Sequence, residues 1–183
     1  IELKQSTVDA LNNAINAVDY TLDITMQETV NGYADAIVAA TEELDFVSTI
    51  VLKADSVATI NDKAYIRGLT DIWSEDEITS QFDVYGKDTR IVVTPTVNGY
   101  GTGTLVQHFD GEELVKEYVI IVDADANGDA FVDAIDVTIV ANLINEFEEP
   151  ETEYIMAAID LCEDGWLDAI DLTVIINIAN MAF

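Results

Sequence analysis

The sequence predicts a multidomain α+β protein built from three consecutive segments. Apolar residues recur at helical spacing in the first segment, short β-branched runs alternate with turn signals in the second, and a loop–helix unit occurs twice in the third. We therefore expect an N-terminal helical hairpin or bundle over residues 1–48, a small, mostly β module over residues 49–122, and an all-α duplicated unit over residues 123–183.

The first segment is expected to be helical between about residues 6 and 47. Val8, Leu11 and Ile15 follow the spacing of one apolar helix face, and a second run of small and branched residues covers 34–40. Asn31-Gly32 is a common turn signal. We therefore expect this dipeptide to separate two helices.

The second segment contains five short runs that are rich in β-branched and aromatic residues. Asn98-Gly99 and Asp110-Gly111 are dipeptides typical of hairpin turns. Between the runs, residues 74–77 read Ser-Glu-Asp-Glu, which is a capping-box pattern. We expect this pattern to start a short helix that continues through Phe82.

Charge is distributed very unevenly along the chain. The formal net charge is −29, and no Lys, Arg or His follows Lys116. This balance argues against nucleic-acid binding and against attraction to anionic membranes, and no apolar stretch is long enough to span a bilayer. The single cysteine excludes an internal disulfide, and the start at Ile1 instead of Met suggests part of a longer protein. A folded segment without basic residues is expected to recruit cations from solution.

An internal repeat occupies this segment without basic residues. DANGDAFVDAIDVTIVANLI begins at Asp125 and DLCEDGWLDAIDLTVIINIA begins at Asp160, 35 residues later. Both copies contain DAID followed two residues later by Thr, and both pass directly from clustered polar oxygens into an apolar run. The connector NEFEEPETEY is expected to be a linker or the start of a short helix.

The spacing of the oxygens in each repeat fits a calcium loop of the EF-hand type. Such a loop supplies ligands from positions 1, 3, 5, 7 through a backbone carbonyl, 9 and 12. The first loop would use Asp125, Asn127, Asp129, Phe131 through its carbonyl, Asp133 and Asp136. The second would use Asp160, Cys162, Asp164, Trp166 through its carbonyl, Asp168 and Asp171. We expect two bound Ca²⁺ ions.

Each loop departs from the ideal pattern at one position. Position 6 normally requires Gly, but Ala130 occupies it in the first loop, so a positive φ there would cost about 1 kcal/mol. Cys162 occupies an oxygen position in the second loop, and a protonated thiol is a weak calcium ligand. We therefore expect the second site to be the weaker one. The alternative, two acidic helix-capping turns without metal, does not explain why the spacing occurs twice.

The third segment resembles a dockerin, on the evidence of DANGDAFVDAID, DLCEDGWLDAID and the helices that follow them. Dockerins are duplicated calcium-loop–helix modules that bind cohesin modules of a scaffoldin in cellulosome-type assemblies. The resemblance implies calcium-dependent docking of a larger secreted bacterial protein, at a cell-surface complex that degrades polysaccharides. It also implies a module that is monomeric until it binds its partner and that does not insert into a membrane.

The resemblance further implies which residues meet the cohesin. Partner choice in dockerins usually depends on loop positions 10 and 11 and on the exposed helix faces. These positions are Ala-Ile in both repeats, which implies an apolar contact and two usable orientations. The alternative is that Ile135 and Ile170 belong to the core. The expected partner-binding residues are Ala134, Ile135, Ala141, Asn142, Ala169, Ile170, Ile176 and Asn177.

The other two segments also show resemblances. YIRGL, SEDEITSQF and GYGTGTLVQHFDGEELVKEYVIIVDAD resemble the small β module that often precedes dockerins. YTLDITMQETVNGYADAIVAATEEL resembles the FIVAR-type helical repeat of bacterial surface proteins, here in truncated form. Neither resemblance implies catalysis. We expect a non-catalytic region whose parent protein is a polysaccharide-degrading enzyme or a scaffold subunit.

The sequence offers three alternative functions. An EF-hand switch would expose a Met-rich groove, but the chain has only three Met and no obvious helix enters the first loop. A carbohydrate-binding or adhesive accessory region could use the aromatic residues of the second segment. A hydrolase could use residues 75–77 as an acid pair, but these fit a first helical turn better, and His108 has no nucleophile motif beside it. The aromatic candidates are Tyr65, Trp73, Tyr85 and Tyr100.

Overall fold

The computed structural model describes residues 1–69, 74–146 and 149–181 and divides the chain into two compact units. Unit 1 comprises Ile1–Thr49 and Val84–Thr89, and unit 2 comprises Ile50–Asp83 and Arg90–Phe183. Both helices and sheets are present, which confirms the mixed α+β class. The three expected segment boundaries stay a prediction.

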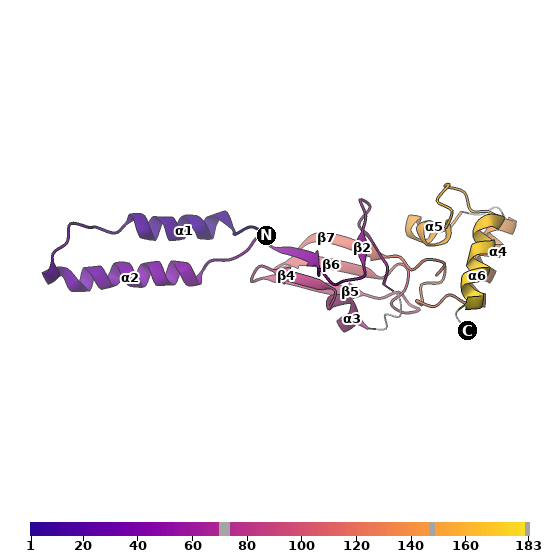
Figure 1. The fold of residues 1–183 in the computed structure, drawn as a ribbon, viewed down its shortest axis with the longest axis horizontal. Helices are drawn as coiled ribbons and strands as arrows, with labels where there is room; N and C mark the ends of the chain where they lie inside the picture. Colours follow the sequence, from indigo (N-terminus) through magenta and orange to yellow (C-terminus); the bar gives the residue numbers. More distant parts are fainter. Residues whose placement is uncertain (70–73, 147–148, 182–183) are drawn as a thin grey trace. The chain divides into compact units, whose positions relative to one another are not determined.

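Unit 1 contains a helical hairpin. Helix α1 (Gln5–Asn16) is followed by a short 3₁₀ turn, η1 (Ile24–Met26), and by α2 (Gln27–Glu42). The two α-helices pack side by side (Figure 1). Both lie wholly within the described residues, and neither contains a buried residue.

The expected break at Asn31-Gly32 is wrong, because this dipeptide lies inside α2. The chain turns earlier, where Asp19 Oδ1 accepts a hydrogen bond from Thr21 N and Asp23 Oδ1 accepts one from Thr25 N, each at 2.8 Å. Such side-chain bonds to nearby backbone N–H groups compete with a helix. A single Gly costs a helix only about 1 kcal/mol, so the helix continues through it.

Polar contacts close the base of the hairpin within unit 1. Leu3 and Phe46 form an isolated β-bridge, and Lys4 Nζ lies 2.9 Å from Asp45 Oδ2. The backbone N–H of Lys87 donates to Asp45 Oδ1 at 2.8 Å. The hydrogen bond from Lys4 lowers the pKa of Asp45 against the opposing effect of desolvation. These contacts hold the two ends of the hairpin together.

Unit 2 contains the larger sheet, in the order β2-β3-β7-β6-β5, with β3 and β7 parallel and β6 and β7 antiparallel. Asp110 pairs with Glu113 across a two-residue turn, so a tight hairpin does form at Asp110-Gly111. A second, two-stranded sheet pairs β1 with β4. The strands are β1 (Thr49–Leu52), β2 (Thr59–Ile60), β3 (Tyr65–Arg67), β4 (Phe82–Tyr85), β5 (Thr89–Thr94), β6 (Leu105–Asp110) and β7 (Glu113–Ile120).

The connection between β5 and β6 is longer than the expected hairpin turn at Asn98-Gly99. A turn is present, since Thr96 N donates to Gly99 O at 2.9 Å, but residues 95–104 form an extended connection instead of a two-residue loop. We call residues 95–104 the bracing loop. Residues of this loop contact the first repeat of the helical part.

The capping box at Ser74 is confirmed. Ser74 Oγ accepts from Glu77 N at 3.3 Å and donates to Glu77 Oε2 at 2.9 Å, at the start of α3 (Glu75–Thr79). The helix is shorter than expected, because Phe82 already begins β4. Ile78, which α3 carries, is fully buried in the core of the β-rich part.

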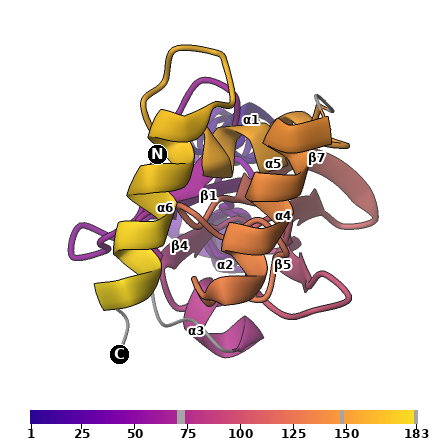
Figure 2. The same cartoon turned by 90° about the vertical axis from the view of Figure 1, so that its right-hand side faces the viewer.

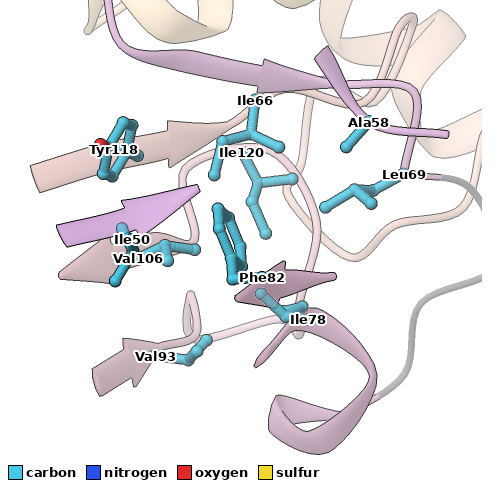
Figure 3. Packing of buried hydrophobic residues seen from close by; sticks show 10 residues of the cluster. All are labelled: Ile50, Ala58, Ile66, Leu69, Ile78, Phe82, Val93, Val106, Tyr118 and Ile120. Atoms are coloured by element: carbon cyan, nitrogen blue, oxygen red, sulfur yellow. The ribbon is translucent and has the colours of Figure 1, made fainter. Parts of the chain in front are cut away.

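That core gathers side chains from both sheets and from α3 (Figure 3). Ile66, Val106 and Ile120 come from three neighbouring strands and are almost completely buried. Phe82 from β4 lies among them. Apolar burial across all these elements makes the small β module a packed structure.

The C-terminal part of unit 2 is helical. It contains α4 (Ala134–Glu146), α5 (Glu153–Ile159) and α6 (Ala169–Met181), and α4 packs beside α6 (Figure 2). Val140 and Ile175, expected on the inner helix faces, are fully buried. α5 shows that the acidic connector ends in a short helix, which Thr152 caps by accepting from Ile155 N.

The β-rich part and the helical part share a second core of buried apolar residues. Tyr65 from β3 and Ile121 belong to the same buried cluster as Val140 and Ile175. Arg67 pairs with Asp123 and also donates through Nη2 to Ala157 O at 2.5 Å. Arg67, a basic residue of the β-rich part, therefore contacts the C-terminal segment, which has no basic residues. Among the described residues, no helix has the length and apolar character needed to cross a membrane.

Candidate functional site

The last acidic residue of each loop is held in the same way in both repeats. Asp136 Oδ1 accepts from the backbone N–H groups of Ala126 at 2.9 Å and Asn127 at 3.1 Å, and Oδ2 accepts from Asp133 N at 2.9 Å. Asp136 lies in the first turn of α4, where the helix dipole favours a carboxylate. The first loop is therefore closed onto its helix.

Asp171 repeats this arrangement in the second loop. Its Oδ1 accepts from Leu161 N at 3.0 Å and Cys162 N at 3.1 Å, and its Oδ2 accepts from Asp168 N at 3.1 Å. Both Asp136 and Asp171 are fully buried. The sequence repeat is thus also a repeat of structure.

The loop interiors also correspond. Asp133 and Asp168, at the same position of the two loops, each accept a 2.6 Å hydrogen bond from the backbone N–H two residues later. Asp129 and Asp164 do the same at 2.8 Å and 2.9 Å. The side chains of Phe131 and Trp166, expected to contribute only carbonyls, are exposed. Every expected oxygen donor is thus in the loop or at the start of its helix.

The first residue of each loop differs sharply between the repeats. Asp125 is fully buried and accepts from Gly128 N at 2.7 Å, Ala130 N at 3.1 Å and, from the bracing loop, Thr102 N at 2.8 Å. Asp160 is only half-buried and accepts from Gly165 N of its own loop at 2.9 Å. The first loop is built into the protein more deeply than the second.

Each loop needs two residues with left-handed backbone and has Gly at only one of them. In the first loop Gly128 has φ +77° and Ala130 has φ +73°; in the second Glu163 has φ +57° and Gly165 has φ +84°. Ala130 thus has the positive φ at which a strain is expected from the sequence. The positive φ at loop position 4, where Glu163 lies in the second loop, was not expected from the sequence. Each loop thus contains one strained non-glycine residue.

Cys162 distinguishes the second loop chemically. Its side chain is exposed, and its Sγ lies with carboxylate oxygens of Asp160 and Asp164 in a group within 4.8 Å of one another. Interaction with the Asp171 carboxylate, together with desolvation, raises the pKa of the Cys162 thiol to about 11. The thiol is therefore protonated at neutral pH and is a poor ligand for a hard cation.

Asp125 and Asp136 of the first loop are shielded from water. Desolvation raises the pKa of Asp125 and of Asp136, although backbone N–H donors partly offset it. At Asp171 desolvation acts in the same direction, but hydrogen bonds from Asp168, Cys162 and Leu161 outweigh it and lower the pKa. Buried carboxylates without nearby cations favour a bound metal ion.

The donor chemistry fits calcium in the first loop and fits it incompletely in the second. The first loop has carboxylate, carboxamide and carbonyl oxygens at its ligand positions, and Ca²⁺ prefers such oxygens. The second offers the same set except for the thiol of Cys162. The ligand set expected from the spacing stays a prediction.

The expected partner-binding residues lie on the surface of the helical part. Ile135 is 54% exposed and Ile170 is 59% exposed, so the alternative that they belong to the core is wrong. Both lie at the start of a helix, one residue before the last Asp of the loop. Ala134, Asn142, Ala169, Ile176 and Asn177 are also exposed, and Ala141 is half-buried.

The residues of the alternative functions are placed differently. Tyr65 is buried in the second core, and Tyr85 and Tyr100 are half-buried, while Trp73 lies outside the described residues. Glu75, Asp76 and Glu77 form the first turn of α3. His108 is buried in β6, and desolvation lowers its pKa. These positions match structural roles for the described residues.

The geometry defines a pair of EF-hand-like loop–helix units. Residues 123–179 match the family model of the dockerin type I domain, so this part of the chain is a dockerin type I domain. The matched part is less than half of the chain. Comparison with curated proteins and with solved structures finds no significant match. The domain accounts for calcium-dependent binding of a cohesin, through which a protein docks onto a scaffoldin.

Proposed function

We propose that residues 123–183 dock a larger secreted protein onto a scaffoldin, with one Ca²⁺ held by each loop and the cohesin bound in either of two orientations. The parent protein would be a polysaccharide-degrading enzyme or a scaffold subunit, and the region described here would itself be non-catalytic. The module would be monomeric until it meets the cohesin.

The observation that supports two orientations is the matched placement of Ile135 and Ile170. Both are more than half exposed, and each directly precedes the last Asp of its loop, which makes the same three hydrogen bonds in the two repeats. A rotation that exchanges the two repeats would therefore present the same apolar side chain and the same helix start. The cohesin would meet an equivalent surface either way.

Two ions are supported by the twofold repetition of the donor set. A bound Ca²⁺ supplies positive charge that compensates the buried carboxylates and joins the loop residues to the helix that follows. The chain's own residues then set the recognition surface, because Asp136 and Asp171 fix where α4 and α6 begin. A rigid surface lowers the entropy lost when the partner binds.

Substitution of the two isoleucines tests this proposal. Ile135→Asp or Ile170→Asp alone is expected to weaken binding about twofold, since one of two equivalent orientations remains. The double variant is expected to weaken binding about 100-fold or more, because a charge then lies in an apolar contact in both orientations. Calorimetry or surface plasmon resonance against a panel of type I cohesins, with calcium present, measures this.

Val38→Asp is a matched control, since Val38 is 55% exposed on α2 in the other unit. It should leave cohesin binding unchanged. A severe loss from one isoleucine substitution would contradict two usable orientations. No binding by any cohesin in the panel would contradict the docking function itself.

A further inference from the structure

The bracing loop makes direct contact with the first calcium loop, and in the part of the chain that the structure describes it makes no equivalent hydrogen bond to the second loop. Thr102 N donates to the buried Asp125 Oδ2 at 2.8 Å. Thr96 Oγ1 donates to Gly128 O at 2.8 Å, and Asn98 Nδ2 donates to Asn127 O at 2.6 Å. Three residues of the bracing loop thus hold loop positions 1, 3 and 4.

Glycines make this close approach possible. Gly101 is buried, and a Cβ there would collide with Asp125 Oδ2 and Ala130 N. A Cβ on Gly128, in the calcium loop, would lie 2.6 Å from Thr102 O. The two backbones therefore pack against each other with no space for a side chain between them.

The bracing loop is itself fixed. Thr96 Oγ1 accepts from Asn98 N and Gly99 N, each at 3.1 Å. Thr102 Oγ1 donates to Val122 O and accepts from Val122 N, both at 3.1 Å. A rigid element thus contacts the calcium loop, so the contact can restrict the loop before any ion binds.

We infer that the bracing loop is part of the first calcium site and that Thr96, Asn98 and Thr102 are positioning residues that raise its calcium affinity. The inference rests on calcium binding by the first loop, as in the proposed function. A loop already held near its binding shape loses less conformational freedom when the ion arrives. The second loop, whose Asp160 is held from within its own loop, lacks this advantage.

A calcium titration of the full chain with the second loop disabled by Asp160→Ala tests the inference. In this background, Thr96→Val removes the hydroxyl while it keeps the shape of the side chain. We expect it to weaken calcium binding by the first loop about fivefold, as for the loss of one hydrogen bond. Thr96→Ser retains the hydroxyl and should bind within twofold of the parent. Isothermal calorimetry measures the affinities.

The same variants in a background with the first loop disabled, by Asp129→Ala, show whether the effect is local. The affinity of the second loop, followed by the fluorescence of Trp166, should not change. An equal loss in both loops, or unchanged first-loop affinity in Thr96→Val, would overturn the inference. Absence of calcium binding by the first loop in the Asp160→Ala parent would overturn both the inference and the proposed function.

Gly101→Ala provides a second variant with a larger expected effect, since its Cβ would displace the Asp125 carboxylate. Gly111→Ala is the control, because no atom lies within 4 Å of the Cβ position of Gly111; its φ of +60° adds a backbone strain that Gly101 does not have, so any general cost of the substitution falls on the control. Circular dichroism at saturating calcium checks that both variants fold. First-loop affinity lowered more by Gly101→Ala than by Gly111→Ala supports the inference; equal effects oppose it.

Discussion

The two calcium loops share a sequence pattern but differ in what surrounds them. Asp136 and Asp171 make the same hydrogen bonds at the same loop position, whereas Asp125 is buried against the bracing loop and Asp160 is half-buried. The first loop therefore depends on a neighbouring module, while the second depends on its own residues. A repeated motif in one domain can thus have two different stabilities.

Calcium removal is expected to have the largest effect and to reveal a difference in stability between the two loops. In excess chelator we expect loss of cohesin binding and a large loss of helical circular dichroism, because desolvated carboxylates then lack a compensating charge. Amides of residues 125–136 should exchange with deuterium more slowly than those of residues 160–171, because contacts with the bracing loop remain. Full cohesin affinity in excess chelator would contradict calcium-dependent docking, and equal exchange would remove the difference between the loops.

Cys162→Asn should reduce the difference between the two loops by strengthening calcium binding in the second loop. It gives the second loop the carboxamide that Asn127 gives the first, so we expect its calcium affinity to rise about tenfold. The reciprocal change, Asn127→Cys, should lower the affinity of the first loop by a similar factor. Calorimetric titration measures both. An unchanged second-loop affinity in Cys162→Asn would show that the thiol is not what weakens this site.

The smallest effect is expected from relief of backbone strain. Ala130→Gly and Glu163→Gly each place glycine at a left-handed position, which should raise the free energy of unfolding by up to about 1 kcal/mol. Ala134→Gly, in the first turn of α4, is a control that should lower it by about 0.5–1 kcal/mol. Urea denaturation with calcium present gives these values. Destabilisation by Ala130→Gly would indicate that the methyl group contributes packing that outweighs the strain.

The calcium loops could be predicted because their ligands lie close together in the sequence. The spacing from Asp125 to Asp136, and its repetition from Asp160, needs no knowledge of the tertiary structure. The capping box at Ser74 was predictable for the same reason. The apparent turn at Asn31-Gly32 was not a reliable guide, because the side-chain bonds of Asp19 and Asp23 decide where that hairpin turns.

The bracing loop could not be predicted from ligand spacing. Thr102 contributes a backbone N–H, which every residue except proline has, so its identity carries no signal. The one hint in the sequence is GYGTG at residues 99–103, since alternating glycines often mark close backbone approach. The contact of this stretch with Asp125 depends on how the sheet and the helices pack.

Cys162 gives the chain a built-in place for a chemical probe. It is the only cysteine in the sequence, its side chain is exposed, and it lies inside the second loop. A thiol-reactive dye would therefore attach at a single atom beside Asp160 and Asp164, without any engineered residue. The rate of labelling would report how open that loop is, and the attached group would block one loop while the other stayed chemically untouched.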